Sequence, residues 1–263
     1  MTPAPLTAQT QGECQWNTSA SGLPIYLIGD SVADHYSEGV IAAGISLGRP
    51  VTVTTAASCP MYHIVVKAVG DAQPVDHTDP TLCVPFVDGT LNWLDEQPAG
   101  TVIIGGTDVL WWNPSPVVPA KYGIGAPADE RTSAVVAGMS ATVERLQAAG
   151  HEVVLAKAPP SYRFPEPGWD KADCSTIEVA QGACFTSEAL ASIDELQQPA
   201  REILDTVAND TGASILDFRA FFCSDEECTT QRGSTSLYLD DIHISVTASK
   251  ELAPRFEAFL GAN

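Results

Sequence analysis

Short apolar runs rich in valine and isoleucine alternate along this chain with longer segments that carry apolar residues at helical spacing. Runs of this length fit strands that are buried on both faces of a sheet. The longer segments fit helices that cover such a sheet. The predicted strands are Pro24–Ile28, Val51–Thr55, Thr101–Ile104, Glu152–Ala156 and Ser214–Phe218.

Helical patterns follow four of these strands. They predict helices at Val32–Leu47, Asp129–Ala149, Ser187–Asp210 and Val246–Leu260. Gly150 stands where a C-cap glycine belongs, because the next strand pattern begins directly after it. The crossover after the second strand shows no clear pattern. The predicted fold is α/β, a three-layer α/β/α sandwich around a five-stranded parallel sheet.

The length of 263 residues fits one α/β domain with long loops. We expect a linker at residues 1–20 and a catalytic domain at residues 21–263. The stretch Met-Thr-Pro-Ala-Pro at the start is typical of a linker, so we expect this chain to be an excised domain of a longer protein. The sequence has no run of about 20 apolar residues that could span a membrane. It also shows no basic n-region followed by an apolar h-region, so we expect the export signal to lie elsewhere.

Acidic residues exceed basic ones, with 33 Asp and Glu against 13 Lys and Arg. This excess repels phosphate backbones and anionic lipids, so nucleic acid is not an expected partner. A solvated acidic surface explains the charge more simply than an acidic binding site does.

Six of the seven cysteines form three local pairs that each close a plausible loop. The pairs are Cys59–Cys83, Cys174–Cys184 and Cys223–Cys228. Zinc is the alternative, but no Cys-x-x-Cys motif occurs and no histidine stands at ligand spacing beside a pair. Disulfides are therefore expected, which indicates an oxidising compartment. Cys14 is left unpaired, and we expect its partner to lie upstream in the full-length protein.

Ser31 follows the first predicted strand in the sequence Gly-Asp-Ser, just where a helix pattern begins. A serine on such a turn lies at the carboxyl edge of the sheet, where open α/β proteins place their ligands. Its backbone N–H at a helix start could stabilise a developing oxyanion. The alternative is an ordinary N-cap serine.

Near the other end, Asp240 precedes His243 by three residues, just before the last helix. In one loop, this spacing lets the carboxylate bind the imidazole Nδ1 while Nε2 faces a serine. Ser245 is better interpreted as the N-cap of that helix. Ser31, His243 and Asp240 are therefore the candidate catalytic triad, and no metal or cofactor is required for their chemistry.

Several segments resemble the SGNH hydrolase superfamily, and more closely the extracytoplasmic SGNH domain that is fused to bacterial acyltransferase-3 membrane proteins. The matching segments are LIGDS at 27–31, SCP at 58–60, CSTIEVAQGAC at 174–184, LDFRAFFCSDEEC at 216–228 and LYLDDIHISVTASKELAP at 237–254. The resemblance implies a flavodoxin-like strand order. It also implies that Ser31 is the nucleophile and that Asp240 and His243 complete the triad.

The residues of the oxyanion hole match the superfamily less well than the residues of the triad do. The loop around Ser58 takes the place of the superfamily's glycine block, and the block that normally reads Gly-x-Asn-Asp ends here in Thr107-Asp108. The expected donors are the backbone N–H groups of Ser31 and Ser58, with the Thr107 hydroxyl in place of an asparagine amide. Loss of one such donor can lower a rate by about 10²–10³.

Three other residues are candidates for substrate binding. Trp111, Trp112 and Asn113 follow the third strand, so they are expected at the catalytic edge, where aromatic rings could stack on a sugar or cover an acyl chain. The alternative, which has equal support, is that these side chains only pack within the loop. His35, with its neighbour Asp34, is interpreted as a surface or capping contact and not as a second base.

The preferred function is O-acyl transfer onto a carbohydrate of the cell envelope, with acetyl as the expected acyl group. The acyl donor would come from a membrane acyltransferase domain, and the domain would be tethered on the extracytoplasmic side. A secreted esterase that uses water as the acceptor is the alternative, because both reactions need the same triad. A glycan-binding module with a degenerate site is a third, non-enzymatic hypothesis.

Overall fold

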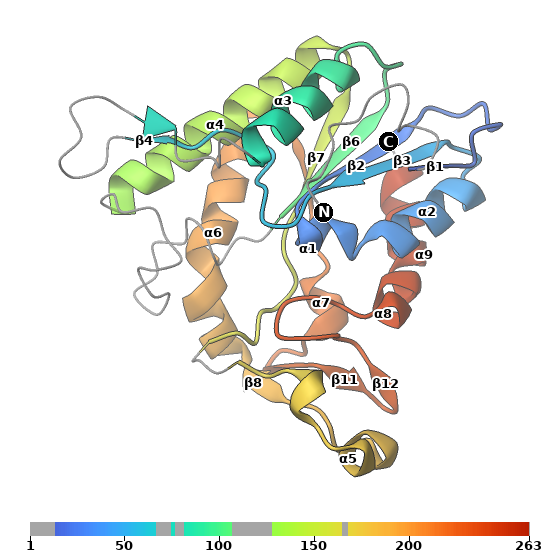
Figure 1. Cartoon of the computed structure of the whole chain (residues 1–263), viewed down its shortest axis with the longest axis vertical. Helices are drawn as coiled ribbons and strands as arrows, with labels where there is room; N and C mark the ends of the chain where they lie inside the picture. Colours follow the sequence, from blue (N-terminus) through green and yellow to red (C-terminus); the bar gives the residue numbers. More distant parts are fainter. Residues whose placement is uncertain (1–13, 67–74, 77–81, 107–127, 165–167, 263) are drawn as a thin grey trace.

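The computed structural model describes residues 14–66, 75–76, 82–106, 128–164 and 168–262. At its centre lies a six-stranded sheet in the order β1-β3-β2-β6-β7-β9 (Figure 1). All neighbours except β1 and β3 pair in parallel. The parallel strands are β2 (Ile25–Gly29), β3 (Val51–Thr55), β6 (Thr101–Gly105), β7 (Glu152–Ala156) and β9 (Ser214–Leu216). The five-stranded flavodoxin-like prediction is confirmed, because these strands follow the order 2-1-3-4-5.

The sixth strand, β1 (Gln15–Trp16), was not predicted and lies within the segment assigned to the linker. Gln15 pairs with Thr52 and Trp16 with Val51, both antiparallel, at the edge of the sheet. Two residues are too few to show the alternation of apolar and polar positions that identifies a strand.

Helices cover both faces of the sheet (Figure 1). Along β2, Tyr26 and Ile28 face one layer, whereas Ile25 and Leu27 face the other. The first layer consists of α3 (Cys83–Leu94), α4 (Ala128–Ala148) and the C-terminal half of α6 (Leu190–Thr211). The second consists of α1 (Ser31–Asp34), α2 (Ser37–Ser46), α8 (Val246–Glu251) and α9 (Ala253–Leu260). Helix α3 is the crossover that the sequence pattern left open.

The helical segments expected at both ends of the chain are each divided in two. The first breaks between α1 and α2 at Tyr36, which is fully buried and donates its hydroxyl hydrogen bond to the carbonyl oxygen of Lys157 at 3.1 Å. The last breaks before α9, where Pro254 occupies the first turn and has no N–H to continue a helix. The range Ser187–Asp210 begins instead with a short strand, β8 (Ser187–Ala189).

A small extension projects beyond the carboxyl edge of the sheet (Figure 1). It contains α5 (Thr176–Gln181), β10 (Glu227–Thr229) paired with β8, and a hairpin of β11 (Gln231–Arg232) and β12 (Thr235–Ser236). The other short elements are β4 (Val65–Val66), β5 (Val75–Asp76), a 3-10 turn at Lys171–Asp173 and α7 (Arg219–Phe222).

The three predicted cysteine pairs are bonded in the structure. They join Cys59 to Cys83, Cys174 to Cys184, and Cys223 to Cys228. The first ties the loop after β3 to the start of α3, and the other two lie in or beside the extension. Cys14 is a free thiol, and its expected upstream partner stays a prediction.

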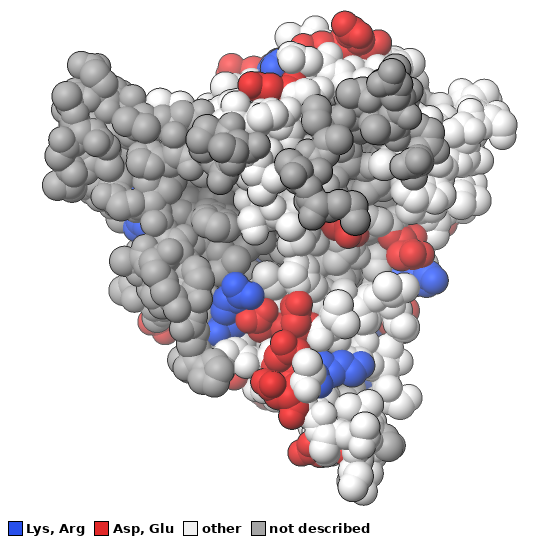
Figure 2. Space-filling model, viewed as in Figure 1, with Lys and Arg blue, Asp and Glu red and all other residues white. Residues whose placement is uncertain are grey.

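On the face in Figure 2, basic side chains lie in small separate groups next to acidic ones, so no basic patch gathers on the described part of this face. Acidic side chains gather in several places on the same face, in keeping with a formal net charge of −20. Within the described ranges, no helix is long and apolar enough to cross a bilayer.

A substitution of Gly29 tests how tightly the end of β2 is packed. A β-carbon there would lie 1.9 Å from the carbonyl oxygen of Gly105, and φ is +149°. Gly48 also has a positive φ, of +63°, but has no neighbour within 4 Å. We expect Gly29→Ala to lower the free energy of unfolding by about 3 kcal/mol or more, and Gly48→Ala by about 1 kcal/mol. Urea unfolding measures both, and equal losses would contradict the tight packing.

Candidate active site

The turn between β2 and α1 places Ser31 at the carboxyl edge of the sheet. Gly29 lets the chain pass close to Gly105 on the neighbouring strand, where no side chain would fit. Asp30 is buried and caps α1, because its carboxylate accepts the backbone N–H of Val32 at 2.7 Å. Ser31 is thus the first residue of the helix and not its N-cap. The Ser31 hydroxyl is therefore not needed to cap the helix.

Ser31, His243 and Asp240 form a continuous hydrogen-bonded chain. The distance between His243 Nε2 and Ser31 Oγ is 2.8 Å, although the residues are 212 positions apart in the sequence. The distance between His243 Nδ1 and Asp240 Oδ2 is 2.7 Å. The structure therefore brings the predicted triad together in the geometry that a serine nucleophile and a histidine base require.

The carboxylate of Asp240 is held ionised by its surroundings. Burial raises its pKa, but hydrogen bonds from the His243 ring and from the backbone N–H groups of Ile242 and His243 outweigh burial and lower the pKa to about 2. These backbone N–H groups lie 2.9 and 2.7 Å from Oδ1. A carboxylate fixed in this way orients the imidazole and stabilises its protonated form.

The pKa of His243 is raised above its usual value of 6.5. The hydrogen bond with Asp240 is the largest cause, burial opposes it, and the negative charges of Asp240, Asp30 and Asp241 add to it. A raised pKa makes the imidazole a stronger base toward the Ser31 hydroxyl.

The loop that carries Asp240 and His243 is tied to the rest of the fold. Arg163 binds Asp241 through two hydrogen bonds, with Nε at 2.8 Å and a terminal nitrogen at 3.2 Å. The backbone N–H of Tyr162 donates to the Asp241 carbonyl oxygen at 2.7 Å. Asp241 therefore holds the loop in place, whereas Asp240 is the carboxylate on the histidine. Arg163 was missed by sequence analysis, because its partner lies 78 residues away.

Ser58 adopts a left-handed backbone conformation, with φ of +61°. This conformation favours glycine, and Ser58 stands where the superfamily's glycine block is expected. The disulfide between Cys59 and Cys83 holds the adjoining residue. The loop thus has a glycine-like backbone at a non-glycine residue.

Four predicted site residues lie outside the described residues, so the structure says nothing of them: Thr107, Trp111, Trp112 and Asn113. The strand that leads to them ends at Gly105, beside the turn that carries Ser31.

His35, which was interpreted as a surface or capping contact, is partly buried and contacts the loop that carries His243. Its Nδ1 accepts the backbone N–H of Ile244 at 3.3 Å. Its Nε2 is buried without a hydrogen-bond partner among the described residues. Asp34 is exposed and accepts a hydrogen bond from the Thr55 hydroxyl at 3.1 Å. Neither side chain is hydrogen-bonded to the Ser31 hydroxyl in the described part of the chain.

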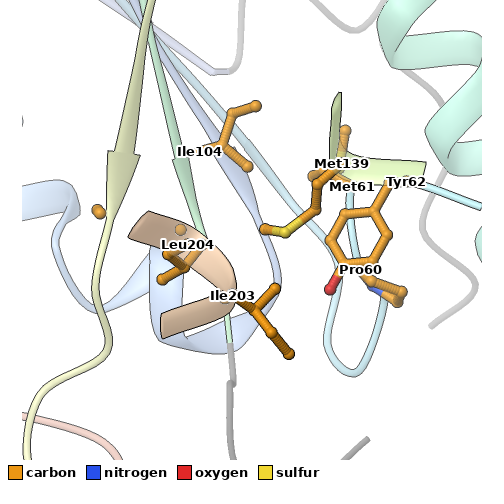
Figure 3. A pocket seen from close by; sticks show the side chains of 10 residues that line it. Pro60, Met61, Tyr62, Ile104, Met139, Ile203 and Leu204 are labelled. Atoms are coloured by element: carbon orange, nitrogen blue, oxygen red, sulfur yellow. The ribbon is translucent and has the colours of Figure 1, made fainter. Parts of the chain in front are cut away.

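A narrow cavity lies beneath the carboxyl ends of β6 and β7 (Figure 3). Its volume of about 20 Å³ has room for about one water molecule, too little for a sugar ring. It lies between the loop after β3, helix α4 and helix α6, and its lining is apolar apart from the phenol of Tyr62. Its lining side chains include Pro60, Met61, Tyr62, Ile104, Met139, Ile203 and Leu204. Within the described part of the chain, no group of three His, Cys, Asp or Glu side chains could hold a metal ion.

Removal of the Asp240 charge should change the titration of His243. Because the hydrogen bond with Asp240 is the largest cause of the raised pKa, we expect Asp240→Asn to lower the pKa of His243 more than Asp241→Asn does. A base must be neutral to act, so the acid limb of the activity profile should move to lower pH in Asp240→Asn while kcat falls about 10³–10⁴-fold. NMR titration of the imidazole and the pH dependence of kcat test this. A larger effect of Asp241→Asn would show that Asp240 is not the carboxylate of the triad.

The backbone at Ser58 can be tested by glycine substitution. We expect Ser58→Gly to raise the free energy of unfolding by about 0.5–1 kcal/mol, because a β-carbon is strained at this φ. The neighbouring Ala57→Gly, where φ is not positive, should instead lower it by about 0.4–1 kcal/mol. Denaturant unfolding measures both, and a loss of stability in Ser58→Gly would show that the serine side chain is needed there.

Several solved structures of known proteins have a fold similar to that of this chain. The periplasmic domain of a lipopolysaccharide acetyltransferase from Salmonella ser. Paratyphi A has a similar fold, with a TM-score of 0.62 and 13% identity over 100% of this chain and 90% of that one. A carbohydrate esterase family 2 enzyme with its carbohydrate-binding domain, from Corynascus thermopiles (Myceliophthora fergusii), gives a TM-score of 0.48 and 15% identity over 92% of this chain and 68% of that one.

An extracellular lipase from Streptomyces rimosus gives a TM-score of 0.44 and 12% identity over 90% of this chain and 99% of that one. No curated protein sequence matches the chain significantly. The family model of the SGNH domain that is fused to AT3 domains matches residues 3–258. The chain therefore belongs to the family of SGNH domains that are fused to AT3 domains.

Proposed function

We propose that this domain transfers an acyl group, acetyl in our proposal, through a covalent intermediate on Ser31. His243 Nε2 takes the proton of the Ser31 hydroxyl as Oγ attacks the acyl carbonyl carbon. The tetrahedral intermediate collapses, the leaving group departs with a proton from His243, and an acyl-enzyme remains. An acceptor hydroxyl then gives its proton to His243 and attacks the acyl carbon, which restores the Ser31 hydroxyl.

The hydrogen-bonded chain from Asp240 through His243 to Ser31 carries this proposal. Its two distances, 2.7 and 2.8 Å, are those of direct hydrogen bonds. The low pKa of Asp240 and the raised pKa of His243 fit an ion pair that strengthens when the imidazole is protonated. An ordinary N-cap serine would require none of these features.

The oxyanion would be bound by the backbone N–H groups of Ser31 and Ser58 and by the Thr107 hydroxyl. The left-handed backbone of Ser58 supports a role for its loop, because a glycine-like turn brings N–H groups to a surface that side chains do not cover. Trp111, Trp112 and Asn113 would bind the acceptor.

The acceptor we propose is a carbohydrate of the cell envelope. The family is described as SGNH domains fused to AT3 domains, which supports a membrane acyltransferase domain in the same full-length chain as the source of the acyl group. The similar fold of a periplasmic lipopolysaccharide acetyltransferase domain is consistent with a glycan acceptor. The three disulfides support an extracytoplasmic location.

Substitution of the nucleophile tests the triad. We expect Ser31→Ala to abolish turnover of p-nitrophenyl acetate and to leave the unfolding midpoint close to that of the wild type, because alanine fits the same half-buried turn. His243→Ala should lose comparable activity. Retained turnover in a folded Ser31→Ala protein would refute the role of Ser31.

The acceptor class is tested with the same substrate in the presence of acetyl-free envelope oligosaccharides. We expect acetylated oligosaccharide, detected by mass spectrometry, and an increase in p-nitrophenol release as the sugar competes with water. Hydrolysis without transfer would favour the esterase alternative. Binding of oligosaccharide without any turnover would favour a glycan-binding module.

A further inference from the structure

Two side chains of one helical turn reach the loop that carries His243. Ser31 and His35 are four residues apart, and the backbone N–H of His35 donates to the Ser31 carbonyl oxygen at 3.2 Å. Residues at this spacing share one face of a helix. Ser31 Oγ contacts His243 Nε2, and His35 Nδ1 accepts the N–H of Ile244, the next residue. The same turn thus contacts both the base and the backbone that follows it.

The N–H of Ile244 depends on this contact. Ile244 is buried, with 3% of its surface exposed, and His35 Nδ1 is the acceptor recorded for its N–H among the described residues. The flanking backbone is already paired, since Leu239 N–H donates to the His243 carbonyl oxygen and Ser245 N–H to the Leu237 carbonyl oxygen, both at 2.8 Å. Without His35, a buried donor directly after His243 would lack a partner, which is costly.

The surroundings of His35 keep its ring neutral, as an acceptor must be. Burial is the largest cause of its lowered pKa, the nearby His243 lowers it further, and the charge of Asp240 opposes both. Its own helix contributes Asp34, which is exposed and bonded to Thr55. The rings of His35 and His243 meet edge to face, with centroids 6.0 Å apart.

We propose that His35 is a positioning residue of the acyl-transfer site: its Nδ1 fixes the backbone at Ile244 and thereby keeps His243 Nε2 on Ser31. This inference rests on the proposed roles of Ser31 and His243. His35 itself does not touch the reacting atoms.

Three substitutions separate this role from simple packing. His35→Asn places an acceptor oxygen as far along the side chain as Nδ1, His35→Gln places it one bond further out, and His35→Leu removes it. An acceptor role predicts that Asn is the best tolerated, although it is the smallest. A packing role predicts that Asn is the worst.

The readout is covalent labelling of Ser31 by a fluorophosphonate, in which an Oγ–P bond forms, fluoride leaves and His243 takes the hydroxyl proton. We expect His35→Asn to label within about threefold of the wild-type rate, and His35→Leu and His35→Gln to label about 10–100-fold more slowly, because small errors in the position of a catalytic group have large effects. Thermal unfolding identifies the folded variants. If His35→Leu does not fold, His35→Gln, which keeps a polar amide, tests the same loss of the acceptor position.

Wild-type labelling rates in His35→Leu or His35→Gln would overturn the inference, as would a slower rate in Asn than in Gln. If wild-type protein itself is not labelled on Ser31, the proposed function fails and the inference fails with it. These results are distinguishable, because the wild-type reaction tests the triad alone.

Discussion

The site depends on the close approach of two strand ends. Gly29 ends β2 against Gly105 of β6, so closely that a β-carbon on Gly29 would overlap the Gly105 carbonyl oxygen and lie 2.5 Å from the β-carbon of Ala33. This packing makes the chain turn sharply between β2 and α1. The turn exposes Ser31 at the sheet edge and buries Asp30 beneath it as the helix cap. The position of the nucleophile is therefore set by backbone packing.

The base reaches that serine from the other end of the chain. The loop from Asp240 to Ile244 has little regular structure, so its shape comes from contacts with two separate parts of the fold, the segment after β7 and the end of α1. Arg163 holds Asp241, and His35 binds the Ile244 backbone. Tyr238, just before the loop, is fully buried and donates to the Pro160 carbonyl oxygen at 2.8 Å. Contacts on several sides restrict the loop, as pre-organised catalysis requires.

Local patterns in the sequence were sufficient to predict most of the fold. Valine-rich runs predicted five parallel strands, and an aspartate three residues before a histidine predicted the carboxylate that binds its ring. The edge strand β1 was missed because two residues carry no periodicity. The break at Tyr36 was missed because the contact of its side chain, a hydrogen bond to Lys157, is with a residue 121 positions away. Arg163 and the partner of His35 were out of reach for the same reason, since both contacts exist only once the chain has folded.

The central claim is that Ser31 forms an acyl-enzyme with help from His243. The most direct test is to mix the domain with p-nitrophenyl acetate, stop the reaction with acid and locate the added acetyl group by peptide mass spectrometry. The account predicts one acetyl group on the peptide that contains Ser31, and none on that peptide in Ser31→Ala or His243→Ala. Acetylation of another residue during turnover, with Ser31 unmodified, would contradict it.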